Sequence, residues 1–198
     1  YPSNPSGSDQ RTSFEVPVDW ADNMGQRVRG YVYPPVSGQY RFWVAGDDES
    51  RLILGTSRDP LTGAVIASVP TWSSSRQWDK FPEQQSVLIN LVAGQSYYIE
   101  ALMKEGGGGD NLAVAWSLPG TSTPVIIAGQ YLSPWQDNRV PTVTNPGSLT
   151  SAVGGNVSVQ IIAADADGDG LAYAASGLPT GLTIHPATGI ITGSPTSI

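Results

Sequence analysis

The sequence predicts an all-β protein built from two β-sandwich domains. It is rich in turn-forming residues, with 23 glycines and 16 prolines among 198 residues, and only 14% of its residues are charged. Valine, threonine and serine recur in short runs where apolar and polar residues alternate, which is the two-residue period of strands. No long stretch has the period of an amphipathic helix. A chain of this length suits one to two domains, each with its own core.

The expected strands follow one another along the first two thirds of the chain, after an irregular lead-in over residues 1–10. Turn signals separate them, notably Pro34-Pro35 and Ser37-Gly38 before the central strand. The strands are expected at 12–18, 25–33, 40–45, 52–54, 65–69, 86–92, 97–103, 112–117 and 124–128.

The composition limits the partners of the protein. The net charge is −7 and no cluster of lysine or arginine occurs, which argues against nucleic acid and anionic membranes. Without cysteine, neither disulfides nor thiolate metal sites can form.

We find no apolar run that could insert directly into a membrane and no signal peptide. Because the chain starts at Tyr1, we expect it to be part of a longer multidomain chain.

Asp47 and Asp48 come directly after the central strand. Leu52 and Leu54 then restart the alternation, so we expect the acidic pair at the mouth of a hairpin. Adjacent side chains on a strand point to opposite faces, so two neighbouring aspartates cannot ordinarily bind one ion. A cis peptide bond would bring their Cα atoms to about 2.9 Å and turn both carboxylates toward one point. A hard cation bound by oxygens, such as Ca²⁺, would hold that arrangement.

The chain resembles the PA14 domain family in two blocks. The first block consists of Gly30, Pro34, Gly38, Tyr40, Phe42, Asp47-Asp48, Leu52 and Leu54. The second runs from Tyr97 to Trp116 and contains a Gly-rich loop followed by a Leu-x-Val-x-Trp strand. The resemblance implies a PA14 β-sandwich over residues 1–136. In sugar-binding members of the family, an Asp-Asp pair with a cis peptide binds Ca²⁺, which directly coordinates vicinal hydroxyls of a glycan.

The Gly-rich loop after residue 104 is the second part of the expected calcium site. Its four glycines allow backbone carbonyls to approach a ligand closely. Phosphate binding would need a helix behind the loop, whereas this loop leads into a strand. The alternative to a ligand site is a flexible hairpin tip. The expected metal ligands are Asp47, Asp48, Glu105, Gly107, Gly108, Asp110 and Asn111.

Glu105 and Asn111 could equally cap this loop through hydrogen bonds. The expected sugar-binding residues are Asp47, Asp48, Trp78, Gln84, Gly109 and Asp110. Trp78 and Trp72 belong to a long polar and aromatic loop. Loops of that length usually carry function or pack over the core. The two tryptophans could therefore stack on sugar rings or cover the sandwich.

Residues 137–198 read as a second, partial domain. The segments at 165–173 and 177–195 resemble the cadherin-like, immunoglobulin-type repeats of bacterial surface proteins, and a strand is expected at 157–163. One strand pair of that repeat is missing, so we expect a β-sandwich that is cut short.

A second aspartate cluster lies in this partial domain. Asp165, Asp167 and Asp169 have the opening spacing of a calcium loop, but the twelfth position is Ser176, so the loop is not an EF-hand. The resemblance to cadherin-like repeats makes these aspartates, together with Asp137 and Asn138, a second possible metal site. The alternative is a solvated Asp-Gly turn.

No catalytic arrangement is apparent in the sequence. The one histidine, His185, stands among turn residues beside Pro186 with no nucleophile motif near it. Asp47 and Asp48 are too close together for either glycosidase mechanism. We therefore predict a protein that is not an enzyme.

The function that these observations favour is a calcium-dependent carbohydrate-binding domain of a bacterial surface adhesin. It would lie outside the cell, at the surface, with cell-surface or matrix glycans as partners. Two alternatives stay open at this point: a carbohydrate-targeting module of a secreted glycoside hydrolase, and a structural or assembly domain that binds no sugar.

Overall fold

A computed structural model describes residues 5–136, 139–167 and 169–196. It contains two compact units, residues 1–135 and 136–198, and each is described by itself. The described residues form β-strands and three short 3₁₀ helices and contain no α-helix, so the all-β class is confirmed. No helix in these ranges is long and apolar enough to cross a membrane.

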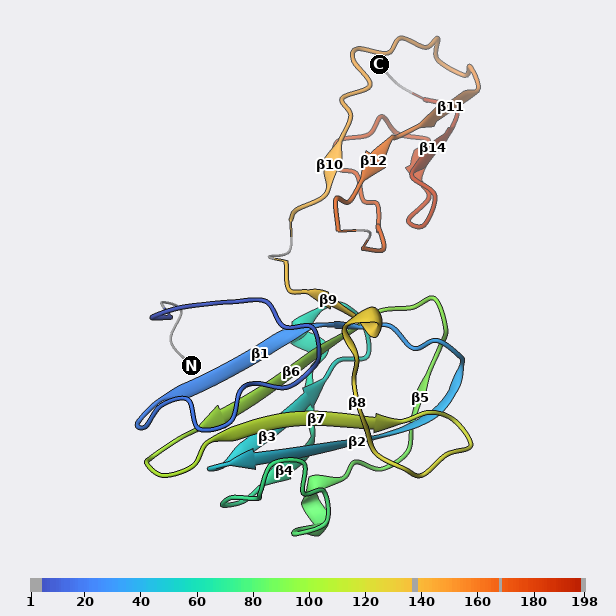
Figure 1. Ribbon diagram of the computed structural model, residues 1–198. Helices are drawn as coiled ribbons and strands as arrows, with labels where there is room; N and C mark the ends of the chain where they lie inside the picture. The colour runs from blue at the N-terminus through green and yellow to red at the C-terminus, as the bar shows by residue number, and fades with distance from the viewer. Residues whose placement is uncertain (1–4, 137–138, 168, 197–198) are drawn as a thin grey trace. The chain divides into compact units, whose positions relative to one another are not determined.

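Two antiparallel sheets make up the first unit (Figure 1). The five-stranded sheet has the order β4 (Ala64–Val69), β3 (Ser50–Leu54), β6 (Tyr97–Lys104), β1 (Gly25–Val32) and β9 (Leu132–Pro134). The four-stranded sheet has the order β5 (Ile89–Leu91), β2 (Gly38–Asp47), β7 (Asn111–Ser117) and β8 (Val125–Ile126). The 3₁₀ helices η1 (Pro60–Thr62), η2 (Pro82–Gln84) and η3 (Gly129–Tyr131) lie in the connections.

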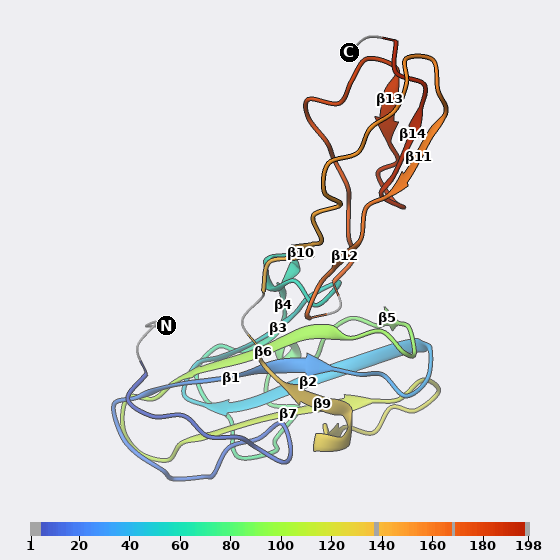
Figure 2. The same ribbon diagram turned by 90° about the horizontal axis from the view of Figure 1, so that it is seen from above.

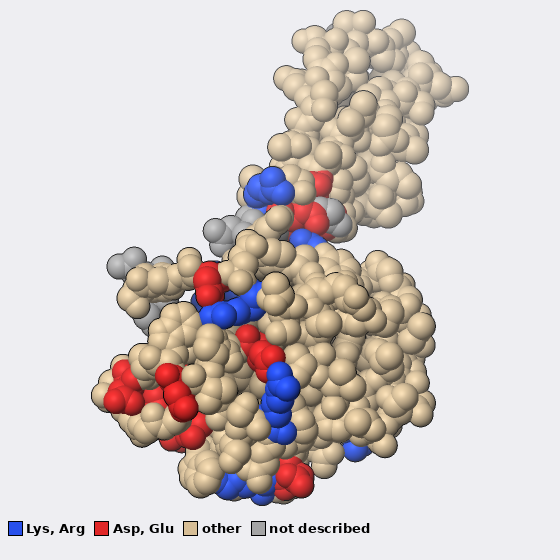
Figure 3. Space-filling model, in the orientation of Figure 1, with Lys and Arg blue, Asp and Glu red and all other residues tan. Residues whose placement is uncertain are grey.

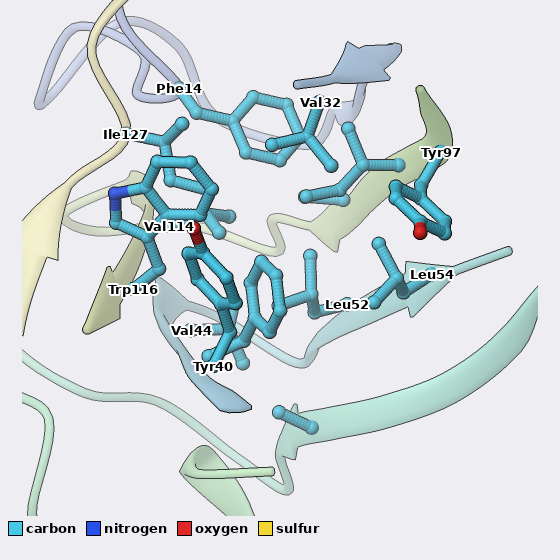
Figure 4. Packing of buried hydrophobic residues seen from close by; sticks show 14 of the residues in the cluster. Phe14, Val32, Tyr40, Val44, Leu52, Leu54, Tyr97, Val114, Trp116 and Ile127 are labelled. Atoms are coloured by element: carbon cyan, nitrogen blue, oxygen red, sulfur yellow. The ribbon is translucent and has the colours of Figure 1, made fainter. Parts of the chain in front are cut away.

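The core of the first unit lies between the two sheets (Figure 4). Tyr40 and Val44 of β2 are fully buried and point inward, because side chains alternate along the strand. Leu52 of β3 enters the same core from the other sheet, and Trp116 of β7 packs on Tyr40 with ring centroids 5.1 Å apart. Fully burying a large apolar side chain contributes about 1.5–3 kcal/mol, so this cluster stabilises the sandwich strongly.

The expected hairpin at the acidic pair is wrong. β2 pairs with β5 and β7, whereas β3 pairs with β4 and β6, so the chain crosses from one sheet to the other after Asp47. The alternation of Leu52 and Leu54 is the same in both arrangements, because both place these side chains in the core. The crossing positions the acidic pair at one end of the sandwich, where the two sheets meet.

Several expected strands are shorter than the sequence pattern indicated. The strand expected at 12–18 is absent, and this segment has only isolated bridges at Ser13 and Glu15, since Pro17 lacks the N–H that a longer ladder needs. The strand expected at 86–92 is limited to β5, and the one expected at 124–128 to β8. The strand β9 was not expected from the sequence, whereas β1, β2, β3, β4, β6 and β7 overlap the segments where strands were expected.

The second unit consists of two small sheets. One is a three-stranded sheet in the order β11 (Val157–Gln160), β14 (Ile190–Gly193) and β13 (Leu182–Ile184), and Figure 2 shows the three strands side by side. β10 (Thr142–Val143) pairs with β12 (Ala163–Ala164). The strand expected at 157–163 is therefore interrupted after Gln160.

Candidate functional site

The acidic pair lies at the end of β2, and its peptide bond is cis, as the sequence predicted. Asp47 is the register partner of Asn111 at the start of β7. The backbone N–H of Asp48 donates to the carbonyl of Lys104, at 3.2 Å. Its carboxylate accepts a hydrogen bond from the N–H of Gly106, at 3.0 Å. Both aspartates thus lie against the Gly-rich loop that joins β6 to β7.

Three carboxylates meet at this point. Asp47, Asp48 and Glu105 each have an oxygen within 4.8 Å of an oxygen of the other two. Figure 3 shows acidic side chains gathered at the end of the first unit where β1 begins. Burial raises the pKa of Glu105 above its ordinary value, and the charges of Asp48 and Asp47 raise it further. Burial also raises the pKa of Asp47, with the charge of Asp48 as the next cause.

Four buried oxygen atoms here accept no hydrogen bond of good geometry, although the backbone N–H of Gly107 is close enough to Glu105 to lower the pKa of its carboxyl slightly. They are both carboxylate oxygens of Glu105, Oδ1 of Asp110 and Oδ1 of Asn111. Glu105 and Asp110 are only 3% and 1% exposed. Leaving a buried acceptor unmatched costs about 1–3 kcal/mol, and more for a charged group. An oxygen-bound cation would satisfy these atoms, so the residues present fit the Ca²⁺ that the sequence implied.

The N-terminal segment 19–22 also belongs to this region, and the sequence analysis missed it. Oδ2 of Asp110 accepts hydrogen bonds from the N–H groups of Trp20 and Ala21, at 2.6 and 2.9 Å. Oδ1 of Asp22 accepts one from the N–H of Gly108, at 3.1 Å. The segment has two aspartates within four residues. That signal is weak, because no local sequence pattern connects these aspartates with the acidic pair, which follows much later in the chain.

The glycines of the loop are needed where carboxylates approach the backbone. A Cβ atom on Gly109 would lie 3.1 Å from Oδ1 of Asp19, and one on Gly106 would lie 3.2 Å from Oδ2 of Asp48. Gly108 has a φ of +120°, which residues with a side chain rarely adopt. Gly107 and Gly108 are exposed, and their expected role as carbonyl ligands stays a prediction.

Trp72 is the aromatic residue beside the acidic pair. It forms an isolated antiparallel bridge with Asp47, so the two side chains share one face. Trp72 is 49% exposed, so it is not part of the buried core and half of its surface is open to a ligand. The ammonium group of Lys80 lies 2.8 Å from the centroid of the indole ring, and the charge of Lys80 lowers the pKa of Asp47.

Two residues expected to bind sugar lie elsewhere. Gln84 is fully buried, and its Nε2 donates to the carbonyls of Val44 and Gln77, at 3.0 and 2.6 Å. It therefore holds the loop to β2 and cannot reach a ligand, so its expected role is wrong. Trp78 lines a separate groove together with Arg41. The spacing of polar residues along a long loop does not reveal which of them turn inward.

The second aspartate cluster has the hydrogen bonds of a turn. Oδ1 of Asp165 accepts from the N–H groups of Asp167 and Asp169, at 2.8 and 3.1 Å. The carboxylate of Asp167 pairs with the guanidinium of Arg139, at 2.9 Å. Asp137 and Asn138, the other members of the expected metal site, lie outside the described residues. Arg139 thus supplies the positive charge that a metal ion would otherwise bring to Asp167.

Comparisons of the chain with known proteins identify the family of each unit. Residues 14–130 match the PA14 domain family, which is more than half of the chain. The chain belongs to the PA14 family. Residues 140–198 match the He_PIG family of Ig domains, which confirms the immunoglobulin-type nature of the second unit.

Relatives of this PA14 protein are diverse. It is 31% identical over 166 residues to the N-acetyl-beta-glucosaminyl-glycoprotein 4-beta-N-acetylgalactosaminyltransferase 1 of Mus musculus, covering 78% of this chain and 16% of the mouse protein. It is 27% identical over 82 residues to fibrocystin of Canis lupus familiaris, covering 38% of this chain and 2% of fibrocystin. The PA14 chain thus spans a small part of each of these relatives.

Solved structures with low sequence identity resemble part of the PA14 chain. The epithelial adhesin 6 A domain of Candida glabrata, in complex with Galβ1-3GlcNAc, is 18% identical with a TM-score of 0.45, covering 60% of this chain and 54% of the adhesin chain. The PA14 domain of the MpAFP antifreeze protein is 21% identical with a TM-score of 0.42, covering 56% and 51% of the two chains.

Proposed function

We propose that residues 1–136 form a calcium-dependent carbohydrate-binding domain of a cell-surface adhesin, and that residues 137–198 belong to an extending Ig-type domain. The observation that carries this proposal is the set of unmatched oxygens of Glu105, Asp110 and Asn111 beside the cis-linked aspartates. Buried charges are ordinarily paired or bound to metal. In the described part of the chain, neither Lys nor Arg forms an ion pair with Asp47, Asp48 or Glu105.

The ligand set suits a hard cation. Asp47, Asp48, Glu105 and Asp110 supply carboxylate oxygens, and Asn111 supplies an amide oxygen. Ca²⁺ takes six to eight oxygens, so a bound ion would offer its remaining positions to water or to two neighbouring hydroxyls of a sugar. Asp47 and Asp48 are half-buried and the glycines beside them are exposed, so one side of the cluster is open to a ligand.

The surroundings of the cluster suit a sugar. Trp72 lies on the same face as Asp47 and is half exposed, and the face of its ring that Lys80 does not cover can pack on the C–H face of a sugar ring. A sugar must displace water from the ion, so we expect weak binding at one site and useful adhesion through several copies. The same module in a secreted glycoside hydrolase would use the same residues.

A structural role for the ion is the second candidate. It is favoured by Asp110, which anchors the segment at Trp20 with one oxygen and leaves the other oxygen free for the cation. Such an ion would tie the N-terminal segment to the Gly-rich loop and stabilise the unit without any sugar.

A glycan array distinguishes the two roles. The wild-type protein is applied with Ca²⁺ and with EDTA, beside Asp48→Asn, which keeps an acceptor for Gly106 but lowers the charge of the site. We expect binding to sugars with vicinal hydroxyls that disappears in EDTA and in Asp48→Asn, and persists in the control Glu83→Gln at an exposed position. If no glycan signal depends on Ca²⁺ while Ca²⁺ still raises the melting temperature, the ion is structural.

A further inference from the structure

We propose that the PA14 unit carries a second groove, which binds neutral carbohydrate without calcium. The groove has a volume of about 490 Å³. Its lining residues come from β2, from the segment that contains η2 and from the connection between β7 and β8, whose courses along the chain can be followed in Figure 1. Its lining includes Arg41, Trp43, Trp78, Asp79, Phe81 and Gln85.

The groove is separate from the acidic cluster. None of the three clustered carboxylates lines it. Trp43 precedes Asp47 by four residues on β2, which corresponds to roughly 13 Å along a strand, and Arg41 lies two residues further away. Loss of the cation should therefore leave the groove intact.

Aromatic side chains form the walls and are held in place before a ligand arrives. Trp78 and Phe81 are half-buried, and Trp43, which also lines the groove, is 6% exposed. The buried side chain of Gln84 fixes this segment to β2, since it also accepts a hydrogen bond from the N–H of Phe81, at 2.9 Å. A preformed aromatic wall costs little ordering free energy on binding, and its flat faces suit the C–H faces of a sugar.

The polar groups of the groove indicate a ligand that both donates and accepts hydrogen bonds. Arg41 donates from Nη1 to Oε1 of Gln85, at 3.3 Å, and its buried Nε meets no acceptor. Within the described ranges Arg41 and Asp79 form no ion pair, although both line the groove. A guanidinium offers only donors and a carboxylate only acceptors, and a sugar hydroxyl can serve either.

This pairing of charges favours a neutral sugar over other occupants. An acidic sugar would be attracted by Arg41 but repelled by Asp79, and a cationic ligand the reverse, whereas a neutral sugar meets neither repulsion and can hydrogen-bond to both groups. A proline-rich peptide could lie on the aromatic walls, but its carbonyls are acceptors only and would offer no donor to Asp79.

Affinity electrophoresis in EDTA tests the groove. The protein is run in native gels that contain dextran, mannan or galactomannan, which are neutral polysaccharides. We expect at least one of them to retard the wild-type protein, and Trp78→Ala to weaken that retention by roughly tenfold, as when an aromatic anchor is removed from an interface. Asp79→Asn, at an exposed position, should also weaken it. Trp20→Ala removes another exposed tryptophan and Asp48→Asn alters the acidic cluster; both should be retarded like the wild type.

Three results would overturn the proposal. They are no retardation of the wild type in any of the three gels, equal retardation of the wild type, Trp78→Ala and Asp79→Asn, and release of the protein by poly-L-proline but not by free oligosaccharide. The melting temperature of Trp78→Ala shows whether that variant folds. If Trp78→Ala does not fold, the retardation of Asp79→Asn tests the proposal instead. Because all runs contain EDTA, their outcome is independent of the calcium-dependent signal on the glycan array.

Discussion

The carboxylate of Asp110 accepts a hydrogen bond from the backbone N–H of Trp20 at 2.6 Å, across ninety positions of sequence. Its second oxygen is buried and unmatched. One side chain therefore joins the N-terminal segment to the acidic cluster, and the cation site and the conformation of that segment should depend on each other.

Substitution of Asp110 separates these two roles. Asp110→Asn keeps one acceptor for the Trp20 amide but removes a charge from the cluster, so we expect weaker Ca²⁺ binding with the segment still ordered. Asp110→Ala removes both the acceptor for the Trp20 amide and the charge of the cluster. Calorimetry measures the Ca²⁺ affinity, and hydrogen exchange at the amides of Trp20 and Ala21 measures the order of the segment. Equal exchange in wild type and Asp110→Ala would show that Asp110 does not anchor the segment.

Addition of Ca²⁺ should stabilise the PA14 unit. A ligand that binds only the folded state contributes about 2.7 kcal/mol when its concentration is 100 times Kd, which raises the melting temperature by several degrees. Calorimetric melting with Ca²⁺ and with EDTA measures the shift. Asp48→Asn should lose most of the shift, while Glu83→Gln, with an exposed acid outside the cluster, should retain it. A full shift in Asp48→Asn would place the ion somewhere else.

The cis bond between Asp47 and Asp48 was predictable because its signal is local. Adjacent side chains on a strand ordinarily point to opposite faces, so the prediction that both aspartates bind one ion required an unusual peptide bond, and the structure has that cis bond. The positions of β2 and β7 were likewise predictable from the period of two, but that period did not reveal that β7 is buried on both faces and β2 over most of its length.

Long-range features were not predictable from the sequence. The crossing of β2 to β3 between sheets gives the same alternation as a hairpin, because both bury Leu52 and Leu54. The contribution of Asp22 depends on a contact with Gly108 that no local pattern encodes. Gln84 reads as a polar loop residue, and its burial follows only from the backbone carbonyls that surround it.

The cation-free protein should lose stability as the pH rises. Folding raises the pKa of Asp47 and Glu105 above their ordinary values of 3.8 and 4.5, so the folded state binds these protons more tightly than the unfolded state. The free energy of unfolding then falls as the pH increases from the ordinary toward the raised pKa values, and it stays low above them. A tenfold difference in proton affinity between the folded and unfolded states corresponds to about 1.4 kcal/mol.

Thermal melting in EDTA between pH 4.5 and 7 tests whether the stability of the cation-free protein falls as the pH rises. Glu105→Gln should be more stable than the wild type at pH 7 in EDTA and should show a smaller loss on going from pH 4.5 to 7. With Ca²⁺ present the trend reverses for the wild type, because protons displace the ion at low pH. Identical pH profiles of Glu105→Gln and wild type in EDTA would contradict the proposed charge repulsion.

Gln84→Ala should destabilise the PA14 unit by about 2–4 kcal/mol, because the backbone groups of Val44, Gln77 and Phe81 lose their partner in the interior. Urea unfolding measures the change. The matched control is Glu83→Ala at the neighbouring exposed position, which should stay within about 0.5 kcal/mol of wild type. A similar small effect of both variants would mean that water replaces the amide of Gln84.

Calcium titration should give one ion per chain. The acidic cluster of the PA14 unit has unmatched buried oxygens, whereas Asp167 is paired with Arg139 and Asp165 is bonded to the backbone of its own turn. We expect Asp167→Asn to bind Ca²⁺ with the wild-type stoichiometry and affinity, and Asp48→Asn to lose the binding isotherm. Two ions per wild-type chain and one per Asp167→Asn chain would instead establish a metal site in the Ig-type unit, with Arg139 displaced from Asp167 when the ion binds.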